Sequence, residues 1–152
     1  MLDLLRNFIR RVETPAAHFG DDDSRLALAA LLVHCSGIDG TVSAAESATL
    51  RDVLARSFRL PEPDLDRLIA DAIAAEQESV DLYRFTSVLK RQMGEAERIA
   101  AVETLWEIVF ADGIASEFEE NLVWRIADLL GVSSRDRIAG KRLATERKPR
   151  SE

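Results

Sequence analysis

The sequence predicts an all-α protein that forms a single compact bundle of seven to eight helices. Alanine and leucine are abundant and glycine is scarce, which favours helix because such side chains lose little freedom there. Apolar residues recur at helical spacing, and no segment shows the alternating pattern of a strand. The motif Asp-Gly-x-x-Ser-x-x-Glu occurs twice, at 39–46 and at 112–119. Two copies in identical register indicate a duplicated helix–loop–helix unit.

Seven helices are predicted in the main domain, at about residues 24–37, 44–57, 63–78, 81–94, 95–111, 116–131 and 134–145. The first and fifth of these are apolar nearly all round and should be buried on most sides. His34, in the first helix, is expected to be a core or boundary histidine with a partner. The third helix should turn one apolar face inward, consisting of Leu65, Leu68, Ile69, Ala72 and Ile73.

Capping residues predict where several helices begin and end. Acidic residues at 21–23 should cap the first helix, and Asp81 the fourth, which should stop near Gly94. Gly131 is the expected C-cap of the helix that opens at Ser116. Ser133 or Ser134 should then cap the last helix.

The chain divides into three predicted segments: 1–19, 20–146 and 147–152. The first is an amphipathic helix and a linker, the second is the helical domain, and the third is a basic tail. Packing onto the domain is the favoured role of the N-terminal helix, and docking to a membrane surface or partner is the alternative. The basic C-terminal residues are predicted to form a helix end whose positive charges complement the helix dipole, and not a nucleic-acid-binding patch.

The composition is that of a soluble globular protein and excludes several classes. The 152 residues are 47% apolar and 31% charged, which suffices for a sizeable core. The net charge of −7 disfavours nucleic acid and suits cations or basic partners. Cys35 is the only cysteine, so no internal disulfide can form. No run approaches the roughly 20 apolar residues of a membrane span, and the start lacks a signal cleavage site. We therefore expect a cytoplasmic protein that is not integral to a membrane.

Each motif fits a helix-capping box, in which Ser accepts from the amide three residues later and Glu reaches back to the Ser amide. Capping does not explain the Asp-Gly that precedes it in both copies. Asp-Gly-x-x-Ser-x-x-Glu is also the second half of an EF-hand calcium loop. The first half is missing, because apolar residues, a glycine and a cysteine occupy the positions of its first ligands: Cys35, Gly37, Ile108 and Phe110. An ordinary EF-hand is therefore excluded.

Helical angles place Glu46 and Glu119 on the inward faces of their helices, within about 60° of apolar residues. If the two units pack about a pseudo-twofold axis, Asp39, Glu46, Asp112 and Glu119 could converge at one end of the bundle. Four carboxylates at close range repel, and a proton or a divalent cation would relieve the repulsion. These residues are the candidate metal ligands. Their loops carry few further oxygens, so Ca²⁺, Mg²⁺ or Mn²⁺ should bind weakly.

Trp124 interrupts the pattern of its helix. It lies away from Glu119 on a polar face with Glu117, Asn121 and Asp128. Two interpretations stay open: it packs under the N-terminal segment, or it is an exposed partner-binding anchor.

The two motifs, the segment 80–86 and the closing segment 127–132 resemble the TerB-like tellurite-resistance family, over about residues 20–145. The resemblance implies an all-helical fold, an acidic face, divalent-cation binding and membrane-associated stress-response complexes. Carried over residue by residue, it assigns that face to Asp39, Glu46, Asp112 and Glu119.

An enzyme is disfavoured, since only His18 and His34 are available and no nucleophile–His–acid pattern or phosphate loop occurs. We predict no catalytic or organic-cofactor residues. Two functions stay open. One is a cation-responsive domain in a stress or tellurite-resistance complex. The other is a purely structural protein-interaction module, whose glutamates are only caps and whose anchors are Trp124 and the N-terminal helix.

Overall fold

The structure is a computed structural model, which describes residues 19–20, 23–36, 44–78, 81–111, 113 and 115–147. Within these ranges the chain forms helices and no strand, so the predicted all-α class is confirmed. The helices are α2 (Ser24–Ser36), α3 (Ala44–Phe58), α4 (Glu62–Glu78), α5 (Tyr83–Gln92), α6 (Glu95–Val109), α7 (Glu117–Leu129) and α8 (Ser134–Arg147). The helix predicted near the N-terminus lies outside the described residues, and so does the basic tail except for Arg147, the last residue of α8.

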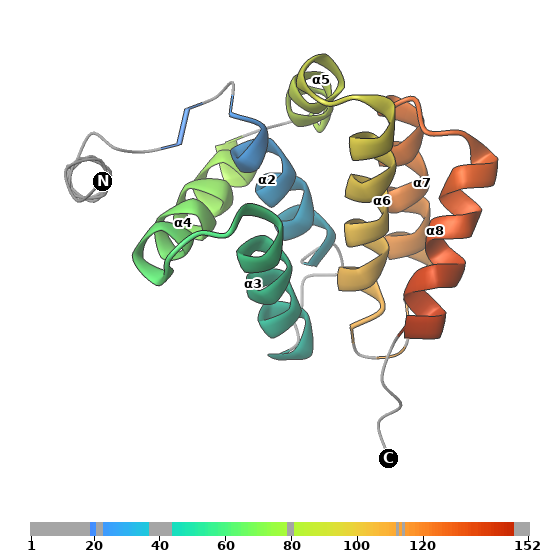
Figure 1. Ribbon diagram of the computed structural model, residues 1–152, viewed down its shortest axis with the longest axis horizontal. Coiled ribbons are helices and arrows are strands. Elements are labelled where there is room, and N and C mark those ends of the chain that lie inside the picture. The colour runs from blue at the N-terminus through green and yellow to red at the C-terminus, as the bar shows by residue number, and fades with distance from the viewer. Residues whose placement is uncertain are drawn as a thin grey trace.

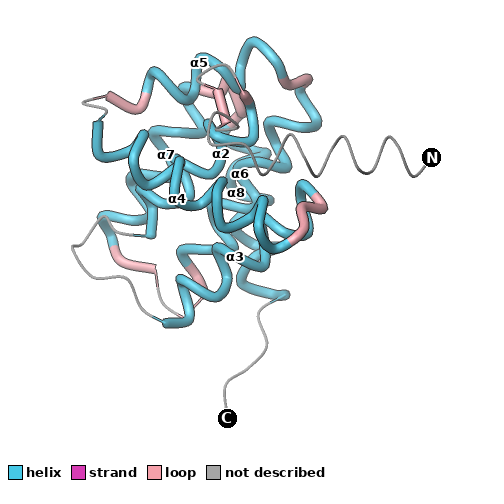
Figure 2. Tube along the Cα trace, turned by 90° about the vertical axis from the view of Figure 1, so that its left-hand side faces the viewer, coloured by secondary structure: helices cyan, strands magenta, loops and turns pink. Residues whose placement is uncertain are grey.

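Helix α2 is the centre of the bundle. It packs against α3, α4, α5 and α6 (Figures 1 and 2), so nearly every side of it faces protein. All residues from Leu26 to Leu32 are buried. The sequence predicts this burial from the lack of any polar face.

Helix α6 is the second buried helix, with Trp106 as its largest fully buried side chain. It packs against α2. The contacts of these two helices correspond: α3, which follows α2, also touches α6, and α7, which follows α6, also touches α2. A twofold axis between the units α2–α3 and α6–α7 would exchange these two contacts. Figure 1 shows α6, α7 and α8 on one side of the molecule and α3 and α4 on the other.

Helix α8 completes the bundle by lying along α6. The close approach occurs at Gly140, where an added Cβ would stand 3.3 Å from Glu103 Cγ and 3.4 Å from Trp106 Cδ1. The indole Nε1 of Trp106 donates a hydrogen bond to the carbonyl of Arg137, at 3.1 Å. This bond gives the buried indole N–H an acceptor, which a buried Trp requires.

Most predicted caps are present. Gly131, with φ of 75°, ends α7 in a Schellman motif, because Val132 N–H donates to the carbonyl of Ala127 and Gly131 N–H to that of Asp128. The hydroxyl of Ser133 accepts from the amide of Asp136 at the start of α8. At the start of α5 the predicted cap was wrong by one position: the N-cap is Leu82, and Asp81, which precedes it, accepts from the amide of Tyr83.

Helix α5 ends at Gln92 with Met93 as its C-cap, so the predicted stop near Gly94 is confirmed, and Gly94 itself is the N-cap of α6. A further sequence-based expectation was wrong. Ile73 was expected on the inner face of α4 but is 40% exposed. Its helical position lies at the margin of the buried stripe, where side-chain spacing alone does not decide burial.

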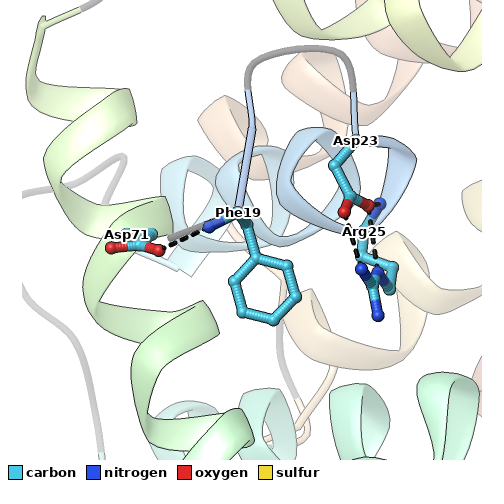
Figure 3. A network of polar contacts seen from close by, with 4 residues as sticks. All are labelled: Phe19, Asp23, Arg25 and Asp71. Carbon is cyan, nitrogen blue, oxygen red and sulfur yellow. Dashed lines mark hydrogen bonds and ion pairs between the residues drawn. The ribbon is translucent and has the colours of Figure 1, made fainter. Parts of the chain in front are cut away.

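The chain reaches α2 through a small polar network (Figure 3). The amide of Phe19 donates to Asp71 of α4 at 3.0 Å, and the Arg25 guanidinium stacks over the Phe19 ring. Asp23 caps α2 by accepting from the amide of Arg25, and its carboxylate also pairs with the Arg25 side chain at 2.7 Å. The acidic cap expected at this helix start is thus confirmed for Asp23.

Candidate functional site

Glu46 and Glu119 are both buried, each with 5% of its surface exposed. Glu46 lies in the first turn of α3, and Glu119 lies in the first turn of α7. The inward orientation predicted for both side chains is therefore confirmed. Buried glutamates are rare without a partner, because a carboxylate loses its hydration there.

The capping box at Glu119 is present in full. The amide of Ser116 donates to Glu119 Oε1 at 2.7 Å, and the amide of Glu119 donates to Ser116 Oγ at 3.1 Å. Gly113, with φ of 102°, makes the turn that leads into this cap and adopts a backbone conformation that favours glycine. The equivalent residues of the first unit, Gly40 and Ser43, lie outside the described part of the chain.

The structure brings the two glutamates together. A hydrogen bond joins their side chains, although α3 and α7 belong to different units. The pKa of Glu119 is raised to about 7, chiefly by burial, and the hydrogen bond with Glu46 and the charge of Glu46 act in the same direction, while the bonds from Ser116 act against them. A carboxyl group can donate to a carboxylate only when it is protonated, so this contact favours the form of the pair in which Glu119 carries a proton.

Cys35 forms part of the surroundings of this pair. It is fully buried on α2, and the nearby charge of Glu119 adds to the effect of burial in raising the pKa of its thiol. The thiol is therefore protonated at neutral pH and is not a nucleophile or metal ligand in this state. The prediction of Cys35 as a small buried residue is confirmed.

The remaining predicted ligands, Asp39 and Asp112, lie outside the described residues. Among the residues that the structure does describe, no group of three or more His, Cys, Asp or Glu side chains is placed to hold a metal ion. The described portion of the candidate site is thus the Glu46–Glu119 pair. Two carboxyls can supply up to four oxygens, which hard divalent cations accept.

The sequence profile described as "Tellurite resistance protein TerB" matches residues 25–142, from the start of α2 into α8. The chain belongs to the TerB family. The match includes both Asp-Gly-x-x-Ser-x-x-Glu motifs, and it confirms the resemblance inferred from them. No curated protein and no solved structure matches the chain.

In this TerB domain Trp124 is half exposed, at 48%. The guanidinium of Arg137, on α8, lies 3.7 Å from the centre of its ring. Described contacts to Trp124 therefore come from α8, while residues 1–18, the other expected neighbour, are outside the described structure. Whether Trp124 binds a partner stays a prediction.

Sequence reasoning missed Arg137, because it is one of several basic residues on α8 and its spacing does not distinguish it. His34 matches the expected boundary role, with its Nδ1 at 2.8 Å from Glu76 Oε2.

Across the described residues no helix is both long and apolar enough to cross a membrane.

Proposed function

We propose that this TerB domain is a non-enzymatic, divalent-cation-responsive regulatory domain that acts within a stress or tellurite-resistance complex in the cytoplasm. The observation that carries the proposal is the buried hydrogen-bonded pair Glu46–Glu119. A proton on Glu119 relieves the repulsion between the two carboxyls, and a divalent cation could replace that proton while neutralising both groups.

The motif pattern supports the same conclusion. Asp39 and Asp112 each precede one of the paired glutamates by seven residues and by a glycine turn. If they complete the site, the ligand set is made of oxygens alone, which favours Ca²⁺, Mg²⁺ or Mn²⁺ over zinc. Cation binding would then lock the start of α3 to the start of α7 and could alter the end of the bundle that a partner meets.

Thermal unfolding in the presence of each cation tests the proposal. Ca²⁺, Mg²⁺ or Mn²⁺ should raise the unfolding midpoint, because a ligand that binds only the folded state stabilises it. We expect dissociation constants on the order of 10⁻⁴ to 10⁻³ M, as for sites with few charged ligands. A flat titration to about 10 mM at low ionic strength, well above that range, would reject the proposal.

Variants make the test specific. The double variant Asp39→Asn, Asp112→Asn should lose the cation response and be more stable without metal, since carboxylate repulsion is relieved. A matched control, Glu78→Gln with Asp128→Asn, removes the same charge at two exposed positions of α4 and α7. The control should keep the cation response. Equal loss in both double variants would point to net charge rather than to a site.

The second candidate function is a structural protein-interaction module in which the glutamates serve only as caps. The complete Ser116–Glu119 capping box favours it. This function predicts no cation response in the parent protein and no systematic gain from neutralising the two aspartates. The same titration therefore separates the two candidates.

A further inference from the structure

Arg137 carries a charge that no described residue balances. The residue is 8% exposed, and its Nε is buried without a hydrogen-bond partner. Within the described structure its side chain has one partner, the ring of Trp124, at 3.7 Å. A guanidinium whose Nε is buried without an acceptor is unfavourable, and a cation–π contact offsets only part of that loss.

The neighbouring basic residues differ from Arg137. Lys141, one turn further along α8, pairs with Glu120 of α7 at 2.6 Å. Arg98 also has a buried Nε without a partner, but its terminal nitrogen donates to the carbonyl of Met93 at 3.1 Å. The terminal nitrogens of Arg137 have no such acceptor among the described residues, and they are not enclosed as its Nε is.

The surface around this arginine is partly apolar. Trp124 pairs with Arg137 and Glu120 pairs with Lys141, so α7 and α8 run antiparallel along one seam. Trp124 remains 48% exposed, and so does Ile138, which lies three residues before Lys141 and thus near the same edge of α8. We call the surface formed by Trp124, Arg137 and Ile138 the α7–α8 seam.

We propose that the α7–α8 seam binds a partner protein segment that presents one Asp or Glu carboxylate beside an apolar side chain. The carboxylate would accept hydrogen bonds from the terminal nitrogens of Arg137, whose planar guanidinium suits it. The apolar side chain would cover the exposed part of Trp124; tryptophan and arginine are the residues that most often anchor interfaces. This inference goes beyond the proposed function and uses neither Glu46 nor Glu119.

The charges on α7 narrow the chemistry of the partner. Glu117 and Asp128 are exposed on the same side of α7 as Trp124 and would repel a segment rich in acids. A single carboxylate with uncharged neighbours meets Arg137 without that repulsion. The seam should therefore prefer an isolated acidic residue in an apolar setting.

A titration of the isotope-labelled full chain, observed by NMR, tests the proposal. The probes are two synthetic peptides, acetyl-Ala-Leu-Glu-Leu-Ala-amide and its counterpart with Gln in place of Glu. The Glu peptide should shift the signals of Arg137 Nε–H and of the Trp124 indole N–H. The Gln peptide should bind at least about tenfold more weakly, the loss expected for one charge-assisted hydrogen-bonding group. The indole of Trp106, which is fully buried, reports that the fold is intact.

Substitutions on α8 provide the matched control. Arg137→Lys keeps the charge but loses the planar fork, and it should weaken binding of the Glu peptide by about tenfold. Arg142→Lys makes the same change at an exposed position of α8 and should leave binding unchanged. Equal binding of the two peptides, equal effects of the two substitutions, or no shift up to about 10 mM peptide would overturn the proposal. If Arg137→Lys fails to fold, the comparison of the two peptides on the parent protein decides alone.

Discussion

At the scale of single residues, Glu119 combines two roles that are usually separate. One of its oxygens caps α7 through the Ser116 amide, and its carboxyl is also hydrogen-bonded to Glu46 of the other unit. The bonds from Ser116 favour the charged form of Glu119, whereas burial and Glu46 favour its protonated form. The net effect is a raised pKa. The protonation of Glu119 is therefore linked to folding.

Glu119→Gln should remove a pH dependence of stability. The folded protein holds the Glu119 proton up to about pH 7, whereas the unfolded chain releases it near its ordinary value of 4.5. Its contribution is thus fully present below pH 4.5 and is lost as the pH rises through about 7. Gln preserves the cap and can donate to Glu46, so the variant should exceed the parent by up to about 3 kcal/mol at pH 8 and match it near pH 4.

Urea unfolding across this pH range measures the effect, with Glu117→Gln as the control at an exposed neighbouring position. The control should follow the parent at every pH. If Glu119→Gln also follows the parent, Glu119 acts as a cap alone.

Trp124→Ala should destabilise the protein only modestly. Trp124 is half exposed and loses one cation–π contact, so we expect about 1–2 kcal/mol. Trp106→Ala is the contrasting variant, because Trp106 is fully buried and hydrogen-bonded, and it should lose about 3–5 kcal/mol. A loss of about 3 kcal/mol or more for Trp124→Ala in thermal unfolding would show that Trp124 belongs to the core.

At the scale of elements, the position of α8 depends on a glycine. Gly140 lets α8 approach α6 so closely that Trp106 can donate to the backbone of Arg137. A larger side chain would push the helices apart, and it would disturb both that bond and the α7–α8 seam. The packing of α8 thereby connects the core to the surface around Trp124.

Gly140→Val should destabilise the protein by about 1–3 kcal/mol, because its branched side chain would collide with Glu103 and Trp106. Ala139→Val introduces the same side chain at an exposed position of α8 and should lose less than 1 kcal/mol, roughly the helix-propensity difference. Denaturant unfolding of both variants gives the comparison. Because Val has a better helix propensity than Gly, a Gly140→Val variant as stable as the parent would show that the close contact has no cost.

At the scale of the whole molecule, the fold is two helix–loop–helix units around the buried helices α2 and α6. The exchange contacts α3–α6 and α2–α7 are those that a pseudo-twofold axis requires. Such an axis would bring Glu46 and Glu119, which are equivalent in sequence, close to each other. The pair thus joins the two units rather than lying within either one.

An experimental structure should show residues 31–57 and 104–130 superposing as equivalent units, since the same caps and glycine turns recur in register. The comparison also covers the loops that hold Asp39 and Asp112. A continuous helix through either Asp-Gly would contradict the duplication.

Local sequence patterns are enough to predict the helices of the described domain and several of their ends. Helical spacing of apolar residues sets which face of a helix is buried, and caps such as Ser133 and Gly131 act through bonds to near neighbours. The inward orientation of Glu46 and Glu119 follows from the same spacing. These features depend on residues that are close in sequence, so the sequence alone is enough to predict them.

Which of those residues meet depends on how the helices pack in three dimensions. The hydrogen bond of Glu46 to Glu119, the place of Cys35 beside them and the stacking of Arg137 on Trp124 each join helices distant in sequence. The exposure of Ile73 also depends on how neighbouring helices lie. Helix crossings are fixed by packing of whole faces, and no local pattern encodes which two side chains share a contact.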